Sequence, residues 1–264
     1  MPSCQGTAAL VVARIAGMSE RGLAHHVLDE LTPTLRLLAD ENRDELAKRV
    51  LADVTGQQGP TGPVGPPPTP RGVFLRNVVA RLSDIDAALR SIRMAAVFCR
   101  QFPTRRTYEA RGVTESAYLT YHVEHYWQEL YRLRETLLGL VKIVARRAAK
   151  DARDHDERAS IKRFGESLAN TVEAAFEQVA DFRGELVHQS RYRDDDIGRL
   201  DSLSLIMSQL DEADRQVFAT LHNEIYRRKR AEAARQIESM ADSLHLQIEK
   251  IYEVLDTILY GGSG

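Results

Sequence analysis

The stretch FRGELVHQSRY (182–192) contains two side chains suited to phosphate chemistry, Arg183 and His188, with four residues between them. Because a histidine titrates near neutral pH, it can accept the proton of a ribose 2′-hydroxyl or protonate a leaving oxygen. An arginine guanidinium can hold a phosphate through two hydrogen bonds and stabilise the charge that develops during cleavage. The Arg–His pair (Arg183 and His188) therefore predicts RNA cleavage without a metal, with His188 as acid/base and Arg183 as phosphate clamp.

The neighbours of the Arg–His pair indicate a site on a helix. At 100° per residue the two side chains lie about 140° apart, so they can share a site only near the end of a bundle. Gly184, His188 and Tyr192 form a strip at a spacing of four, with Glu185 beside it. A glycine inside a helix costs about 1 kcal/mol relative to alanine, so Gly184 indicates the close approach of a neighbouring helix or a ligand. The competing interpretation is an ordinary solvated helix end.

A second polar cluster lies in the sequence HVEHYWQE, where His122, His125 and Glu129 share one side of a helix. A metal site would need further ligands from another helix, and the Glu-x-x-His pair of di-iron bundles is absent. We therefore predict no metal and no other cofactor. Our interpretation is a polar patch that faces the Arg–His pair, with His125 and Glu129 as supporting residues. The aromatic residues nearby either stack on bases or belong to the core.

The densest basic run is YRRKR, which contains Arg227, Arg228, Lys229 and Arg230. Phosphate binding would suit this run, because each neutralised phosphate releases counterions. The alternative is a solvated helix face balanced by the acids around it.

The composition is that of a globular protein, with 264 residues, 43% apolar residues, 28% charged residues and a net charge of −2. This charge argues against a nucleic-acid coat protein, although a local basic patch remains compatible with it. Cys4 and Cys99 are the only cysteines, which favours a reducing cytoplasm. The early apolar run at 8–18 is too short to span a bilayer and is unlike a secretory signal, so we expect no membrane association.

Proline and glycine divide the chain into three parts. Residues 56–72 are rich in both and predict an extended linker. Residues 1–55 predict a small helical unit whose core is thin, so we expect it to pack on the body or on a second subunit. Residues 73–264 predict the body.

The body reads as helical throughout, with apolar residues every three to four positions. The caps and breakers place helices at 72–102, 115–150, 158–193 and 211–260, with Asp196 capping a short helix that ends near 208. The third long helix has an expected core stripe of Ile161, Phe164, Leu168, Val172, Ala175, Val179, Phe182 and Leu186. We therefore predict an all-α fold, an up-down bundle of four long helices plus short ones.

With its Arg-x4-His motif on a late helix of an all-α bundle, the chain resembles the HEPN superfamily over roughly residues 115–260. Many members of that family are metal-independent ribonucleases of toxin–antitoxin, phage-defence and CRISPR systems. They usually place two copies of the motif across a homodimer cleft. The resemblance implies a cytoplasmic endoribonuclease with an RNA substrate, acting as a toxin or phage-defence effector and controlled by an antitoxin or regulatory protein. The alternative is a non-catalytic helical module that binds a protein partner or RNA.

Overall fold

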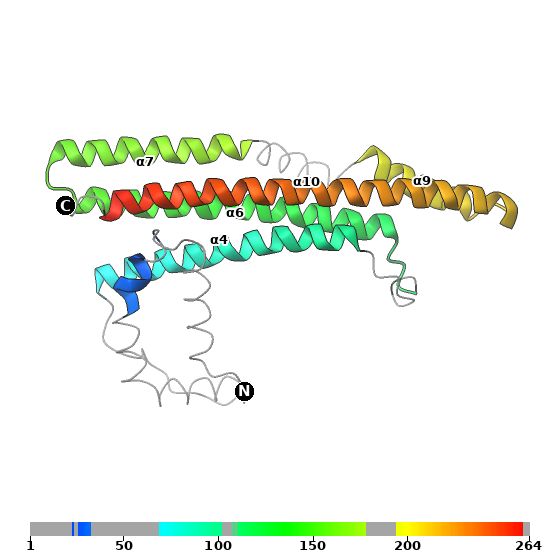
Figure 1. The fold of residues 1–264 in the computed structure, drawn as a ribbon, viewed down its shortest axis with the longest axis horizontal. Coiled ribbons are helices and arrows are strands. Elements are labelled where there is room, and N and C mark those ends of the chain that lie inside the picture. Colours follow the sequence, from blue (N-terminus) through cyan, green and yellow to red (C-terminus); the bar gives the residue numbers. More distant parts are fainter. Residues whose placement is uncertain are drawn as a thin grey trace, which may run out of the picture. The chain divides into compact units, whose positions relative to one another are not determined.

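The computed structural model describes residues 23, 26–32, 69–101, 108, 110–177 and 194–260. Every regular element among these residues is helical and none is a strand, which confirms the all-α prediction. The labelled helices are α4 (Pro70–Arg100), α6 (Glu115–Asp151), α7 (His155–Ala175), α9 (Asp195–Met207) and α10 (Glu212–Tyr260) (Figure 1). Residues 26–32 are helical as well. Within the described ranges, no helix is both long enough and apolar enough to cross a membrane.

Helix α4 begins slightly earlier than expected. The Thr69 hydroxyl accepts the backbone N–H of Gly72 at 3.0 Å, and Pro70 occupies the first helical position, where a missing N–H costs nothing. The last three residues of the stretch predicted as a linker therefore belong to α4. Most of that linker and of the predicted N-terminal unit lies outside the described residues.

Two helix starts are as predicted. The Thr114 hydroxyl accepts the N–H of Ala117 at 3.1 Å, and α6 follows directly. The Asp211 carboxylate accepts the N–H of Asp214 at 3.1 Å at the start of α10. Both side chains satisfy N–H groups that have no partner within the first turn of a helix.

The prediction that Asp196 caps the short helix was wrong, because Asp194 caps α9. Its Oδ1 accepts the N–H groups of Asp196 at 2.9 Å and Ile197 at 3.1 Å. Its backbone is extended, with φ −125° and ψ 128°, as the capping position requires. Asp196 lies instead in the first turn, where its charge interacts favourably with the helix dipole.

The chain forms two compact units. Unit 1 comprises residues 1–83, 139–168 and 249–264, and unit 2 comprises residues 84–138 and 169–248. Helices α4, α6 and α10 each contribute residues to both units, so neither unit is a continuous segment.

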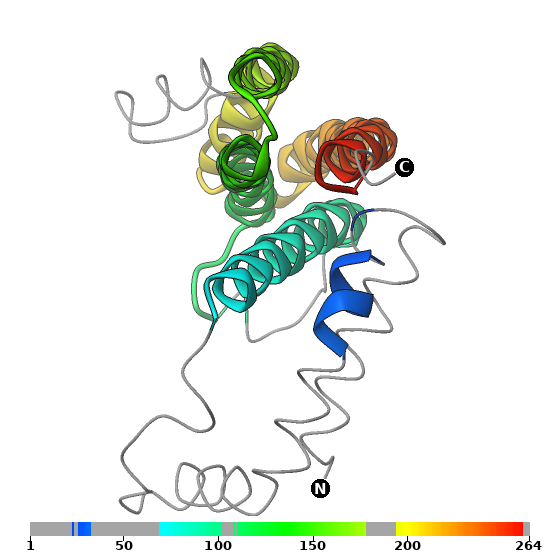
Figure 2. The ribbon, with the colours of Figure 1, turned by 90° about the vertical axis from the view of Figure 1, so that its left-hand side faces the viewer.

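Unit 1 is a helical bundle that Figure 2 views nearly end-on. Its buried core contains Phe74, Val78 and Leu82 of α4, Leu140 and Val144 of α6, and Tyr252 and Leu255 of α10. The helical residues 26–32 belong to the same unit and bury Val27, Leu28 and Leu31. Arg71 donates two hydrogen bonds of 2.6 Å to the Glu30 carboxylate, and the Tyr260 hydroxyl donates a third at 3.1 Å. The segment 26–32 is therefore joined to α4 and α10 by polar contacts as well as by its apolar face.

Helix α7 begins at His155 instead of 158, because the Asp154 carboxylate accepts the N–H of Glu157 at 2.8 Å. Its predicted core stripe was wrong in part, since Phe164 is 47% exposed. Gly165 is buried in its place, and a Cβ built there would lie 2.6 Å from the Cβ of Ala145 on α6. This close approach of two backbones turns Phe164 outward.

The rest of the α7 stripe is mixed. Val172 is buried as predicted, whereas Ala175 is exposed and the neighbouring Phe176 is buried in unit 2. The predicted stripe residues beyond 177 lie outside the described part of the chain.

In unit 2, α4 runs antiparallel to α6. The ring of Phe98 stacks on that of His122 with centroids 4.8 Å apart, and Asp84 near the other end of this segment pairs with Arg132 at 3.3 Å. The core between the helices contains Ile85, Ile92, Leu119, Leu130, Leu200, Ile237 and Leu244. Unit 2 is therefore held chiefly by aliphatic packing of α4, α6, α9 and α10.

Candidate functional site

The predicted catalytic strip lies outside the described residues. Arg183, Gly184, Glu185, His188 and Tyr192 all fall between 177 and 194, so their roles stay predictions. The description resumes at Asp194, six residues after His188 in the sequence.

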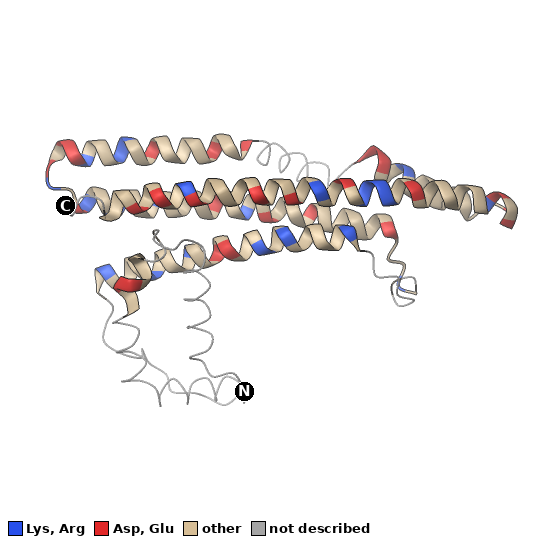
Figure 3. Ribbon diagram, viewed as in Figure 1, with Lys and Arg blue, Asp and Glu red and all other residues tan. Residues whose placement is uncertain are grey.

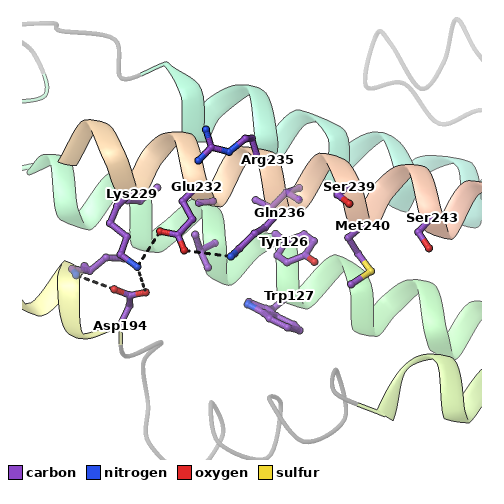
Figure 4. Close-up of a pocket in the computed structure, with 15 residues that line it drawn as sticks. Tyr126, Trp127, Asp194, Lys229, Glu232, Arg235, Gln236, Ser239, Met240 and Ser243 are labelled. Carbon is purple, nitrogen blue, oxygen red and sulfur yellow. Dashed lines mark hydrogen bonds and ion pairs between the residues drawn. The ribbon is translucent and has the colours of Figure 1, made fainter. Parts of the chain in front are cut away.

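Asp194 lies in the lining of an open groove of about 800 Å³ in unit 2. The groove runs between α6 and α10 and ends at the start of α9 (Figure 4). Its apolar lining consists of Leu119, Val123, Tyr126, Trp127, Ile197, Ala233, Ile237 and Met240. Its polar lining consists of Asp194, Lys229, Glu232, Arg235, Gln236, Ser239 and Ser243. An apolar floor with polar groups at its edge is typical of ligand sites.

A lysine surrounded by three carboxylates forms one end of this groove. The ammonium of Lys229 lies 3.4 Å from Asp194, 3.2 Å from Asp196 and 3.4 Å from Glu232. Burial alone would lower the pKa of Lys229, but the hydrogen bond to Asp196 and the nearby carboxylates outweigh it, and the pKa is raised. The same hydrogen bond lowers the pKa of Asp196. Lys229 is therefore charged and its charge is neutralised within the protein.

The predicted basic run is divided among different partners. Basic and acidic residues are interspersed along α10 (Figure 3). The Arg228 side chain is 63% exposed and lies 3.5 Å from Asp196, one of the carboxylates around Lys229. Arg230 donates to the carbonyls of Cys99 at 3.2 Å and Arg100 at the carboxyl end of α4, where a cation is favourable. Because successive helical residues turn by 100°, a run of four cations cannot form one surface. Arg227 is exposed, and RNA binding by this run remains a prediction.

His122, His125 and Glu129 do not converge on one point. His122 is buried between Phe98 and Tyr118, whose ring centroids lie 4.8 and 4.4 Å from its own. Burial, assisted by the neighbouring His125, lowers the pKa of His122 to about 4. His125 is half-buried, and Glu129 lies 3.7 Å from Arg132 of its own helix.

This cluster concerns two predictions from the sequence, the one about a metal site and the one about a polar patch that faces the Arg–His pair. Within the described ranges, no group of three His, Cys, Asp or Glu side chains could hold a metal ion. Whether His125 and Glu129 face the Arg–His pair is not determined, because the pair lies outside those ranges.

Sequence reasoning missed most of the groove lining on α10. Lys229, Ala233, Gln236, Met240 and Ser243 follow each other at spacings of four and three, which places them on one face of the helix. That periodicity is visible in the sequence, but the face is polar at most of these positions. A search for apolar stripes therefore passes over it.

No family model matches this chain, and no match was found among curated proteins or among solved structures.

Proposed function

We propose that this protein is a metal-independent endoribonuclease of the HEPN type, with His188 as acid/base and Arg183 as phosphate clamp. The observation that carries the proposal is the position of Asp194 in the lining of the unit 2 groove. Asp194 follows His188 by six positions in the sequence, and six residues of extended chain span roughly 20 Å at most. RNA bound in the groove would therefore be within reach of the Arg–His pair.

The reaction needs only the groups that the pair supplies. The ribose 2′-oxygen forms a bond to phosphorus while the bond from phosphorus to the 5′-oxygen breaks, giving a 2′,3′-cyclic phosphate and a 5′-hydroxyl. A histidine accepts the 2′-hydroxyl proton and an imidazolium protonates the leaving 5′-oxygen. The arginine stabilises the charge that builds up on the phosphoryl oxygens. No redox partner or metal enters this balance.

A homodimer would supply both protonation states of histidine at one site, as the HEPN resemblance implies. In a two-fold dimer, the same surface of each protomer meets its copy, so the two His188 side chains would lie near the symmetry axis. Light scattering of the purified protein should therefore give the mass of a dimer. We further propose a role as a toxin or phage-defence effector that an antitoxin or regulatory protein holds inactive.

The test is incubation of purified protein with total RNA in EDTA. Wild type should cleave RNA, whereas Arg183→Ala and His188→Ala should each lose activity by on the order of 10²-fold or more. The matched control is His155→Ala, because the His155 side chain is 93% exposed at the start of α7. Equal activity in the wild type and in both pair variants would refute the proposal.

One observation favours a second function, a non-catalytic module that binds a protein. Four large apolar side chains flank the turn between α9 and α10, and all four are exposed: Leu205, Ile206, Val217 and Leu221. Exposed apolar surface of this kind is typical of protein–protein contacts. RNA that stays intact in the assay above would favour this alternative.

A further inference from the structure

Unit 2 has a second groove, between α4 and α6, which we name the aromatic groove. It measures about 450 Å³, within the usual range of small-ligand sites. Helix α4 contributes Ala87, Arg90, Ser91, Met94, Ala95 and Phe98, and α6 contributes Tyr121, His122 and His125. Apart from His125, which the sequence analysis predicts to support the Arg–His pair, these residues have no part in the proposed cleavage reaction.

Three large side chains of the aromatic groove are exposed, two of them aromatic. Tyr121 is 64% exposed, Met94 is 47% exposed and Phe98 is 39% exposed. The rings of Tyr121 and His125 are nearly parallel, at 6°, with centroids 6.4 Å apart. Large aromatic side chains are usually buried at least in part, so two exposed rings on adjoining helices indicate a surface that receives a ligand.

A buried histidine holds these rings in place. The imidazole of His122 stacks on Phe98, and its edge meets the ring of Tyr121 at a centroid distance of 5.1 Å. His122 is 8% exposed, and its Nδ1 atom is buried without a hydrogen-bond partner in the described part of the chain. Because its pKa is lowered to about 4, the imidazole is neutral near pH 7. The base of the groove is therefore an uncharged, preorganised aromatic platform.

The cations beside the aromatic groove favour an anionic ligand. Arg90 lines the groove and lies 2.9 Å from Asp86 one turn away. Arg93, three residues further along α4, is exposed but does not line the groove. An aromatic platform with an arginine at its edge matches single-stranded RNA, whose bases stack on aromatic rings and whose phosphates pair with cations.

We propose that the aromatic groove binds an unpaired base of single-stranded RNA, stacked on Tyr121 and Phe98, with an adjoining phosphate beside Arg90. This inference rests on the proposed function for the identity of the ligand and assigns the groove to substrate binding outside the cleavage site. A double helix offers no exposed base face, so the groove would select unpaired RNA.

The test is the fluorescence anisotropy of a fluorescein-labelled, unstructured 12-nucleotide RNA at fixed salt, in a His188→Ala background that prevents cleavage. Tyr121→Ala and Phe98→Ala should each weaken binding about fivefold or more, because a stacked base contributes roughly 1–3 kcal/mol. Tyr121→Phe keeps the ring and should bind within about twofold of the parent. The matched control is Phe164→Ala, since Phe164 on α7 is 47% exposed and outside the groove, and its affinity should not change.

The outcomes separate this inference from the proposed function. Unchanged RNA affinity in folded Tyr121→Ala and Phe98→Ala would overturn the inference and leave the exposed rings to a protein partner, even if the wild type cleaves RNA. No RNA binding by the parent would also overturn it. Tyr121-dependent binding by a wild type that cleaves nothing would support the groove and refute the nuclease. Circular dichroism of each variant establishes that a loss of affinity does not come from unfolding.

Discussion

The Lys229 ammonium lies 3.4 Å from Oδ2 of Asp194, while Oδ1 of the same carboxylate caps α9. One side chain therefore both begins a helix and joins it to α10. This arrangement also determines one end of the groove in unit 2.

Asp194→Ala should lower the free energy of unfolding by about 1–2 kcal/mol, because the N–H groups of Asp196 and Ile197 lose their acceptor. Asp194→Asn should cost less than half as much, since asparagine caps equally well and only the charge is lost. Urea unfolding monitored by circular dichroism measures both. Asp195→Ala, one residue further, is the control and should cost only a few tenths of a kcal/mol. An alanine variant as stable as the wild type would contradict the capping role.

Two helical glycines should respond to alanine in opposite directions. At Gly198 on α9 an added Cβ meets nothing within 4 Å, so Gly198→Ala should stabilise by about 0.5–1 kcal/mol through reduced chain entropy. At Gly165 the added Cβ would lie 2.6 Å from that of Ala145, so Gly165→Ala should destabilise by about 1–3 kcal/mol. Thermal melts of the two variants provide the comparison. Stabilisation by both substitutions would show that α6 and α7 are not in close contact at Gly165.

The Arg71–Glu30 pair should hold residues 26–32 on α4. The Arg71 hydrogen bond lowers the pKa of Glu30 below its ordinary value of 4.5, despite the opposing effect of burial. The stabilisation is therefore present above pH 4.5 and is lost as the pH falls through the lowered pKa. A double-mutant cycle of Glu30→Gln and Arg71→Met at pH 7 should give a coupling energy of about 1 kcal/mol. A coupling energy that is zero at pH 7, or equal at pH 7 and pH 3, would disagree with this contact.

His122 should make the protein less stable in mild acid. Its pKa is about 4 when folded and 6.5 when unfolded, so between these values only the unfolded chain binds the proton. The free energy of unfolding should therefore fall as the pH falls from 6.5 to 4, by roughly 2–3 kcal/mol at about 1.4 kcal/mol per pKa unit. Denaturant titrations at several pH values measure this slope. His122→Phe should flatten the slope, whereas replacement of the solvated His155 by alanine should leave it unchanged.

Arg183→Lys should be as inactive as Arg183→Ala, because a point charge cannot reproduce the two parallel hydrogen bonds of a guanidinium to phosphate. The single-turnover rate on a labelled RNA should fall on the order of 10²-fold or more. Both variants should unfold within about 1 kcal/mol of the wild type, because we expect Arg183 to be a surface residue. Activity retained by the lysine variant would reduce Arg183 to a general electrostatic role.

The helices and most of their starts followed from local chemistry. Thr114 and Asp211 are each the first capping residue before a periodic apolar segment, and the structure uses both as caps. Three consecutive aspartates, 194 to 196, stand where α9 begins, and by residue type any of them can cap. The extended backbone at Asp194, which the folded chain sets, selected this residue as the cap. A local signal therefore identifies a helix start but cannot choose between equivalent neighbours.

What the sequence alone determined is the all-α class, the positions of α4, α6 and α10, and the Arg–His pair as a chemical hypothesis. These depend on residue type and on spacing along one chain. The tertiary structure decided which residues meet. Gly165, and not the predicted Phe164, packs against Ala145, and Arg230 binds carbonyls at the end of α4. The tertiary structure also brings together the exposed rings of the aromatic groove. Such contacts join residues from 20 to 131 positions apart. They depend on how closely two helix backbones approach each other, and the hydrophobic periodicity of one helix does not determine that distance.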